Sequence, residues 1–416
     1  MAAPATHNLA VDGRRLWETI HETAAFGGTP KGGVRRLTLT DEDRQVRDWF
    51  RAACEALGCT VTIDDMGNMF ARRSGRRDDV APIAFGSHLD TQPTGGKFDG
   101  VLGVLAGLEV LRTLHDAGYE TSAPLELVNW TNEEGSRFAP AMLASGVFAG
   151  AIAKETALAQ TDREGATFGA ELDRIGYRGE EPCGARKFSS FFELHIEQGP
   201  ILQDEDKMIG VVEAVQGIRW YELTLVGQDA HSGATPMRLR RDALVGAARV
   251  VAAVDRIGRA RPDCVGTVGL MEVRPNSRNV SPGEVFLTVD FRSPDDANVA
   301  AMESDLMAAV AEIVSDLGLE GAPVRIWDQP ATIFDAECVA AVEAAAEAFG
   351  QGSRRMVSGA GHDAAYVARV APTAMIFVPC KDGISHNEAE SSTLEQCAAG
   401  AQVLLDAVLR YDRRFG

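Results

Sequence analysis

The chain has 416 residues, 45% hydrophobic and 24% charged, which is an ordinary globular balance and enough length for two domains. Its 41 Lys and Arg against 60 Asp and Glu give a formal net charge of −19, which disfavours nucleic acid and anionic membrane as partners. Seven cysteines without a Cys-x-x-Cys pair, and the absence of any apolar run long enough for a signal peptide or a membrane helix, predict a cytoplasmic protein.

Helices and strands are predicted to alternate through the first half of the chain. The expected elements are helix 41–57 with Thr40 as its N-cap, strand 60–63, strand 81–86, helix 100–114, strand 125–130 and strand 190–196. This alternation predicts an α/β domain whose sheet carries helices on both faces.

The order of elements changes after about Glu213. The next segment is expected to contain strand 218–226, helix 241–257, strand 265–273, strand 284–291, helix 297–317 and strand 323–327, an order that resembles a ferredoxin-like α+β module. The α/β pattern then resumes, with helix 336–349, strand 356–357, helix 362–368, strand 374–378 and helix 394–409. We therefore predict one α/β domain, residues 1–214 and 330–416, interrupted by a smaller domain at 215–329.

Five short segments of the α/β part combine histidines and carboxylates at or after apolar stretches. They are Gly86-Ser-His-Leu-Asp90, Lys97-Phe-Asp-Gly100, Asn132-Glu-Glu-Gly135, Glu193-Leu-His-Ile-Glu197 and Gly383-Ile-Ser-His-Asn387. The ends of strands are where an α/β sheet presents its loops, and imidazole with carboxylate suits zinc, manganese or cobalt. The pattern favours a metal-dependent hydrolase.

Each of these residues also has an ordinary structural explanation. A lone histidine such as His88 is usually structural, but the Asp90 carboxylate could orient its imidazole. Asp99 lies among glycines that permit close backbone approach, and it is suited to bridge two cations. Of the adjacent Glu133 and Glu134, one could bind metal while the other moves protons.

The other candidate histidines carry a weaker signal than His88. His195 and His386 could each be ordinary histidines, and for His231, in the interrupting domain, a role facing the substrate is about as well supported as a structural one. The segment Gly359–Ala364 fits a dinucleotide-binding pattern, but it comes late and without a βαβ unit, so a tight loop before a helix is the better interpretation. No Gly-x-Ser-x-Gly or Walker A segment is present.

Taken together, these motifs resemble the M20 metallopeptidase superfamily, and within it the amidase/hydantoinase/carbamoylase branch. That branch includes N-carbamoyl-L-amino acid hydrolases, β-ureidopropionases and allantoate amidohydrolases. The resemblance covers nearly the whole chain and is carried by Gly-Ser-His88-Leu-Asp-Thr, Gly-Gly-Lys-Phe-Asp99-Gly, Thr-Asn-Glu133-Glu134-Gly-Ser-Arg-Phe, Glu-Leu-His195-Ile-Glu-Gln-Gly-Pro and Gly-Ile-Ser-His386-Asn.

The resemblance implies a role for each matching position. Two divalent cations, of zinc, manganese, cobalt or nickel, are expected on His88, Asp99, Glu134, His195 and His386, with Asp99 as the bridge. Glu133 is expected to be the general base and Asp90 to support His88. For the substrate, the resemblance implies His231 at the oxyanion, Asn279 and Arg292 at a carboxylate, and weaker contacts from Gln198 and the Gly361 backbone. The interrupting domain is expected to be a lid and the homodimer interface, through which His231 and Asn279 could reach the neighbouring subunit's site.

The expected reaction is hydrolysis of a linear carbon–nitrogen bond in an N-carbamoyl-L-amino acid, giving the amino acid, ammonia and carbon dioxide. Allantoate amidohydrolase or β-ureidopropionase is the nearest alternative, and an aminoacylase or dipeptidase is a further one. A non-catalytic, metal-binding dimeric scaffold is the alternative from another class. The intact Glu133 argues against it, because a site that only binds metal does not need a second adjacent carboxylate.

Overall fold

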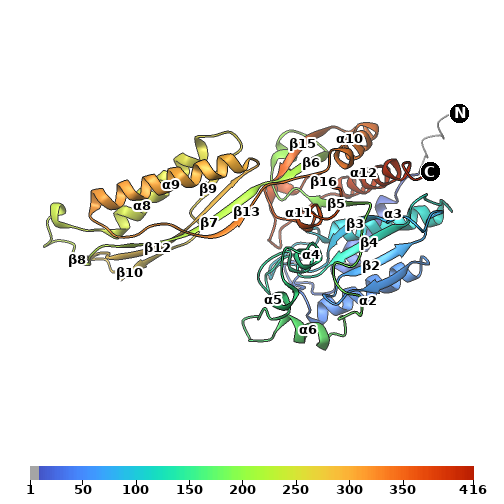
Figure 1. Cartoon of the computed structure of the whole chain (residues 1–416), viewed down its shortest axis with the longest axis horizontal. Coiled ribbons are helices and arrows are strands. Elements are labelled where there is room, and N and C mark those ends of the chain that lie inside the picture. The colour runs from blue at the N-terminus through green and yellow to red at the C-terminus, as the bar shows by residue number, and fades with distance from the viewer. Residues whose placement is uncertain (1–8) are drawn as a thin grey trace. The chain divides into compact units, whose positions relative to one another are not determined.

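The computed structural model describes residues 9–416, so the first eight residues of the expected first domain lie outside the described residues. The chain divides into two compact units (Figure 1). Unit 1 contains the residues up to Glu213 together with Ile333–Gly416, and unit 2 contains Ala214–Thr332. The boundaries expected from the sequence lay directly after residue 214 and directly after residue 329.

Within residues 9–416, unit 1 is built on a nine-stranded mixed sheet in the order β1-β2-β4-β3-β5-β16-β6-β14, with β15 paired to β6. The four central strands β4, β3, β5 and β16 are parallel, whereas β2 is antiparallel to both β1 and β4, and β6 is antiparallel to β16. The strands are β1 Thr60–Ile63, β2 Met69–Arg73, β3 Ile83–His88, β4 Leu125–Trp130, β5 Ser190–Ile196, β6 Ile209–Val215, β14 Thr332–Ile333, β15 Ser353–Ser358 and β16 Thr373–Val378. The predicted mixed α/β fold is confirmed.

Helices cover both faces of this sheet, so β5 is buried along its whole length although its side chains alternate between the faces. Phe192 and Leu194 face α12, where they meet Tyr411 and Gly400. On the other face, Glu193 accepts a hydrogen bond from the Ala364 N–H in α11. The helices are α1 Gly13–Thr23, α2 Asp41–Glu55, α3 Val101–Asp116, α4 Leu143–Phe148, α5 Lys154–Leu158, α6 Phe168–Arg174, α7 Ile201–Asp204, α10 Ala336–Phe349, α11 Asp363–Val367, α12 Leu394–Asp412 and the short 3₁₀ helix η2 Lys381–Gly383.

The register of the parallel strands determines where the candidate site forms. His88 lies opposite Trp130, and His195 lies opposite Phe377. The segments that follow β3, β4, β5 and β16 therefore leave the sheet at one edge, as expected for the carboxyl ends of parallel strands. Each of the five metal-site motifs is at this edge or in a loop that leads from it.

Unit 2 has the strand–helix–strand–strand–helix–strand order of a ferredoxin-like module. Its sheet has the order β10-β12-β7-β13, with β9 also paired to β12, and a separate pair is formed by β8 and β11. Alternate residues of β12 (Val285, Leu287, Val289 and Phe291) are buried in a core shared with α8 and α9 (Figure 1). The elements are β7 Gly217–Val226, β8 Ala230–His231, η1 Met237–Leu239, α8 Ala243–Arg259, β9 Val265–Thr267, β10 Met271–Arg274, β11 Val280–Ser281, β12 Glu284–Ser293, α9 Asp296–Leu317 and β13 Val324–Gln329.

The single strand expected at 265–273 is wrong, because the structure divides it into β9 and β10. Thr267 pairs with Asp290, whereas Met271 pairs with Leu287. An advance of four residues from β9 to β10 therefore corresponds to only three residues of β12. One extra residue is therefore accommodated near Gly269, which is the geometry of a β-bulge. No helix within the described part of the chain is both long and apolar enough to cross a membrane.

Candidate metal centre and active site

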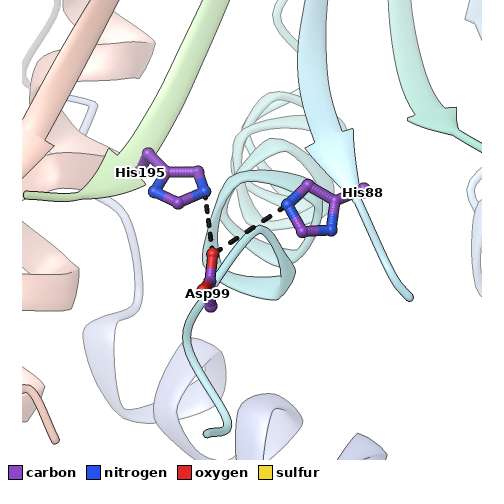
Figure 2. Close-up of side chains that lie close together, drawn as sticks. All are labelled: His88, Asp99 and His195. Atoms are coloured by element: carbon purple, nitrogen blue, oxygen red, sulfur yellow. Dashed lines mark ion pairs between the residues drawn. The ribbon is translucent and has the colours of Figure 1, made fainter. Parts of the chain in front are cut away.

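Two groups of potential metal ligands share one carboxylate, Asp99. The first group is His88, Asp99 and His195, all buried, and the second is Asp99, Glu134 and His386. Within each group the donor atoms lie within 4.8 Å of one another. Figure 2 shows the first group, with both imidazoles directed at the carboxylate from the ends of two strands.

The two oxygens of Asp99 face different groups. Oδ1 lies 3.2 Å from His195 Nε2 and 4.0 Å from His88 Nε2. Oδ2 lies 3.4 Å from His386 Nε2, which is itself 3.6 Å from Glu134 Oε2. A carboxylate with one oxygen toward each group is suited to bridge two cations, although the number of ions stays a prediction.

Backbone carbonyls fix the orientation of the two buried imidazoles. Nδ1 of His88 lies 2.9 Å from the Asp90 carbonyl oxygen, and Nδ1 of His195 lies 2.9 Å from that of Ile196. A carbonyl only accepts, so each Nδ1 carries the proton and each Nε2 is left to face Asp99. Gly100 can approach this closely only because it lacks a side chain: at its φ of 66°, an added Cβ would lie 2.2 Å from the His88 ring.

Unsatisfied polar atoms support a cation at this position. Neither His88 Nε2 nor Glu134 Oε1 has a hydrogen-bond partner among the described residues, although both are buried. Leaving such an atom unpaired costs about 1–3 kcal/mol, which a bound ion would offset. Nitrogen and oxygen donors of this kind suit zinc, manganese, cobalt and nickel.

The expected role of the Asp90 carboxylate needs correction. Its Oδ1 lies 3.9 Å from His88 Nδ1, which is beyond hydrogen-bond distance, because the Asp90 carbonyl occupies that position. The carboxylate instead accepts hydrogen bonds from the N–H groups of Glu133 and Glu134, both at 3.3 Å. Asp90 therefore supports the site in two ways, through His88 and through the turn that carries the two glutamates.

Glu133 lies beside the ligands but belongs to neither group. Its Oε2 is 3.4 Å from His88 Nε2, whereas the Glu134 side chain accepts a hydrogen bond from Gln92 Nε2 at 2.6 Å. Burial, together with the carboxylates of Asp363 and Glu134, holds the pKa of Glu133 well above its usual value. A carboxyl group with a raised pKa, next to a potential metal site, is suited to exchange protons.

The weaker candidates Gln198 and Gly361 also lie in unit 1. Gln198 Nε2 donates to Asp99 Oδ2 at 3.0 Å and lies 3.1 Å from Ser385 Oγ, so this side chain contacts the shared carboxylate. A Cβ at Gly361 would lie 2.9 Å from Met142 Cε, which explains the glycine without a ligand. Contact of either residue with substrate stays a prediction.

His231, Asn279 and Arg292 all belong to unit 2. His231 and Asn279 are neighbours, since the Ser232 N–H donates to the Asn279 carbonyl at 3.0 Å. His231 Nδ1 accepts from the N–H groups of Gly233 and Ala234, at 3.1 and 3.0 Å, so the ring proton lies on Nε2.

Arg292 lies near the far end of β12 from that pair. Its guanidinium is paired with Asp290, at 2.8 Å from Nη2 to Oδ2. Strand β12 begins at Glu284, which is close to β11 in the sequence. Arg292 lies eight residues further along β12, and eight residues of a strand span about 26 Å. Unit 2 therefore does not bring its three candidate residues together.

Residues 84–410 match the model of Peptidase family M20/M25/M40. The chain belongs to the M20 family. An N-carbamoyl-L-amino-acid amidohydrolase from Rhizobium meliloti is 50% identical over 98% of both chains. The crystal structure of an amidase of the hydantoinase/carbamoylase family from Burkholderia multivorans is 58% identical, covers 97% of this chain and 98% of its own, and has a TM-score of 0.95. A ureidoglycolate hydrolase from Oryza sativa subsp. japonica is 33% identical over 96% of this chain and 85% of its own.

Membership of the M20 family confirms the expected class of enzyme, a metal-dependent hydrolase whose relatives act on linear amides. The structure also adds residues that the sequence analysis did not select. Glu193 and His362 form, together with the expected ligand His195, a third buried group of potential ligands. Glu193 and His195 are two residues apart in strand β5 and so share one face, a spacing visible in the sequence, but nothing in the sequence pattern indicated that His362 would join them.

We expect the metal-free M20 protein to lose stability as the pH rises from about 6.5 to 8. Burial raises the pKa of Asp90 to about 7, and a hydrogen bond with Asp99 raises that of His386. In the unfolded chain these two groups have ordinary pKa values, near 3.9 for Asp90 and 6.5 for His386, so the unfolded chain has released protons that the folded state still holds. The free energy of unfolding therefore falls as the pH rises. Burial lowers the pKa of His88 to about 4, which has the opposite effect, but only below about pH 6.5.

Urea unfolding in a chelator at pH 6.5, 7.25 and 8.0 measures this slope, expected to be on the order of 1 kcal/mol per pH unit. The same series with saturating Mn²⁺ or Zn²⁺ is the control, because cations that replace the protons should flatten the slope. A metal-free slope that is flat or positive would contradict the expectation.

Proposed function

We propose that this chain hydrolyses N-carbamoyl-L-amino acids to the amino acid, ammonia and carbon dioxide. The observation that carries the proposal is the arrangement at Asp99. Two groups of potential ligands share its carboxylate, and the separate carboxylate of Glu133 lies beside them in neither group. The 50% identity with the Rhizobium meliloti amidohydrolase supports the choice of substrate over that of the ureidoglycolate hydrolases, which are less similar.

In this proposal the site holds two divalent cations. His88 and His195 would hold one and Glu134 and His386 the other, with Asp99 contacting both. When bound, such cations supply Lewis acidity toward water and toward the carbamoyl carbonyl. The donor set suits zinc, manganese, cobalt or nickel.

Glu133 is the proposed general base. Its raised pKa allows it to take a proton from the attacking water and to give that proton to the leaving nitrogen as the carbon–nitrogen bond breaks. The Asp90 carboxylate accepts hydrogen bonds from the N–H groups of Glu133 and Glu134. It would therefore keep the Glu133 carboxyl group in place during both proton transfers.

Unit 2 is the proposed lid, and its side chains supply the substrate contacts. His231, with its ring proton on Nε2, would donate to the oxyanion. Asn279 and the planar guanidinium of Arg292 would hold the substrate carboxylate. These assignments follow from the family resemblance, and the tautomer of His231 supports the first of them.

The length of β12 supports a homodimer. An amino-acid-sized substrate cannot contact both ends of a strand that spans about 26 Å, so His231 and Asn279 cannot serve the same site as Arg292 of their own chain. We propose that they act at the site of the partner subunit. Edge strand β13 carries Val324 and Ile326 at 62% and 49% exposure, which is an apolar edge suited to association. All seven cysteines are free thiols, which supports a reducing, cytoplasmic location.

The proposed activity is tested by ammonia release from a substrate panel, with and without added Mn²⁺. The panel contains N-carbamoyl-L- and D-α-amino acids, N-carbamoyl-β-alanine, allantoate, ureidoglycolate and N-acetyl-L-amino acids, with free amino acid measured for the acetyl compounds. We expect the N-carbamoyl-L-amino acids to react at least ~10-fold faster than the others, and the activity to disappear with a chelator and return with metal. Faster turnover of allantoate, ureidoglycolate or an acetyl substrate would assign the chain to that activity instead.

Replacing Glu133 with Gln should remove turnover without removing metal. Gln keeps the shape of the side chain but cannot take a proton, so we expect a loss of at least ~10²-fold in kcat. Glu134→Gln is the matched comparison, because the adjacent carboxylate belongs to a ligand group and its replacement should lower the metal content. The two variants are compared by metal analysis after dialysis and by initial rates. Near-normal turnover of E133Q would exclude Glu133 as the base.

Mixed dimers distinguish whether His231 acts in its own subunit or across the interface. His231→Ala and Glu133→Gln should each be nearly inactive alone. If His231 acts in the partner's site, mixing the unfolded variants and refolding them together restores one complete site per heterodimer, or roughly a quarter of wild-type activity for random assortment. If the mixture stays as inactive as its components, His231 serves its own chain. Size-exclusion chromatography with light scattering provides the control that dimers form.

A further inference from the structure

Glu390 connects two ligand-bearing turns that are far apart in the sequence. It is 6% exposed and lies four residues beyond His386. Its Oε1 accepts hydrogen bonds from the N–H groups of Phe98 and Asp99, at 3.0 and 3.1 Å. Its Oε2 lies 3.3 Å from Ser385 Oγ. One buried carboxylate thus holds the backbone at Asp99 and the residue that precedes His386.

The Ser385 hydroxyl extends this connection to the side chain of Asp99. Its Oγ lies 3.0 Å from Asp99 Oδ2, which also accepts from Gln198 Nε2 at 3.0 Å. Glu390 therefore fixes Asp99 through its backbone, while Ser385 and Gln198 contact the oxygen that faces the second ligand group. These contacts leave the other oxygen, Oδ1, directed at His195.

The glycine before this turn is explained by the same carboxylate. A Cβ at Gly96 would lie 2.1 Å from Glu390 Oε1 and 2.5 Å from its Cβ. Any side chain at this position would displace the Glu390 carboxylate from the two N–H groups. The glycine thus makes room for Glu390 to reach the turn that carries Asp99.

We propose that Glu390 is a positioning residue that assembles the second ligand group, Asp99, Glu134 and His386. The inference rests on the proposed metal centre. In the first group, His88 and His195 lie in strands β3 and β5, so two of the three ligands are positioned by the sheet. In the second group all three ligands lie outside strands and helices, on turns. Its geometry therefore depends on contacts between turns, and Glu390 joins two of them.

Replacing Glu390 with Ala should selectively weaken the ion of the second group. We expect wild-type protein to bind two equivalents of Mn²⁺ or Zn²⁺, and E390A to bind one tightly while the dissociation constant of the other rises at least ~10-fold. Glu390→Gln is the rescue variant. Its amide oxygen can still accept from both N–H groups, and its NH₂ group can donate to Ser385, so it should keep both ions within about threefold of wild-type affinity. Chelator competition and metal analysis measure this without reference to activity.

Asp412 provides a matched control at the opposite edge of the sheet. This buried carboxylate also accepts from two consecutive N–H groups about 290 residues away, those of Ser122 and Ala123, at 2.8 and 2.7 Å. These two residues precede β4, whereas the candidate site follows it. Asp412→Ala should lower the melting temperature of the metal-free protein about as much as E390A does, yet keep both ions.

The outcomes are distinguishable. Two equivalents bound by E390A with wild-type affinity would overturn the proposal, as would equal metal loss in E390A and D412A, which would show only general destabilisation. Equal loss in E390Q and E390A would show that the charge acts and not the hydrogen bonds, and would also overturn it.

If E390A does not fold, Glu390→Asp, one methylene too short to reach the turn, should show the same selective loss. Fewer than two equivalents in the wild type would instead contradict the two-ion centre itself.

Discussion

The site depends on keeping one buried carboxylate ionised. Burial disfavours the charge on Asp99, but hydrogen bonds with His195 and His386 outweigh burial and hold its pKa well below the usual value. The Nε2 atoms of these histidines lie 3.2 and 3.4 Å from the Asp99 oxygens. A histidine nitrogen binds metal only when it carries no proton, so a proton on either nitrogen would compete with a bound cation. Backbone carbonyls orient the His88 and His195 rings, and the N–H groups of the Asp99 turn are held by hydrogen bonds. This arrangement is present without a cation, which reduces the reorganisation that metal binding would require.

Adjacent residues Glu133 and Glu134 have different neighbours because the backbone turns between the strand and the site. Asn132 adopts a φ of 61°, and the Glu133 carbonyl accepts a hydrogen bond from the Met142 N–H at 2.6 Å. In an extended strand two consecutive side chains would point to opposite faces. Here the turn directs both toward the site, Glu134 to the second ligand group and Glu133 to His88. Asp90 accepts from both N–H groups and stabilises this arrangement.

The sequence predicts several elements accurately, but amphipathic character does not decide which ones, since the strongly amphipathic helix α1 was missed. Strands β1, β4 and β5 and helix α10 begin and end where the sequence analysis placed them. Helix α1 and strands β2 and β6 were not predicted. The apolar run of β6, Ile209–Val215, comes just before the change in element order, and only its pairing with β16 shows that it belongs to the first sheet.

Within the site, sequence motifs indicate which side chains are chemically suited, and the structure shows which atoms they use. The His-x-Asp spacing pointed to Asp90, but the atom that orients His88 is a backbone carbonyl, which every residue possesses and no motif records. Glu390 was missed for a related reason. Its partners are N–H groups 291 and 292 residues away, and contacts of that range leave no local pattern in a single sequence.

The rigidity of β12 determines how the proposed chemistry can be divided between chains. Its ten residues pair continuously with β7, so the separation between its two ends cannot be shortened by bending a loop. A movement of unit 2 as a whole would carry His231 and Arg292 together without bringing them closer. Any mechanism in which both contact one small substrate therefore needs two copies of unit 2, each contributing one end. In such an arrangement oligomerisation would be a requirement for a complete site, and dissociation of the dimer would remove oxyanion stabilisation while leaving the metal ligands of unit 1 intact.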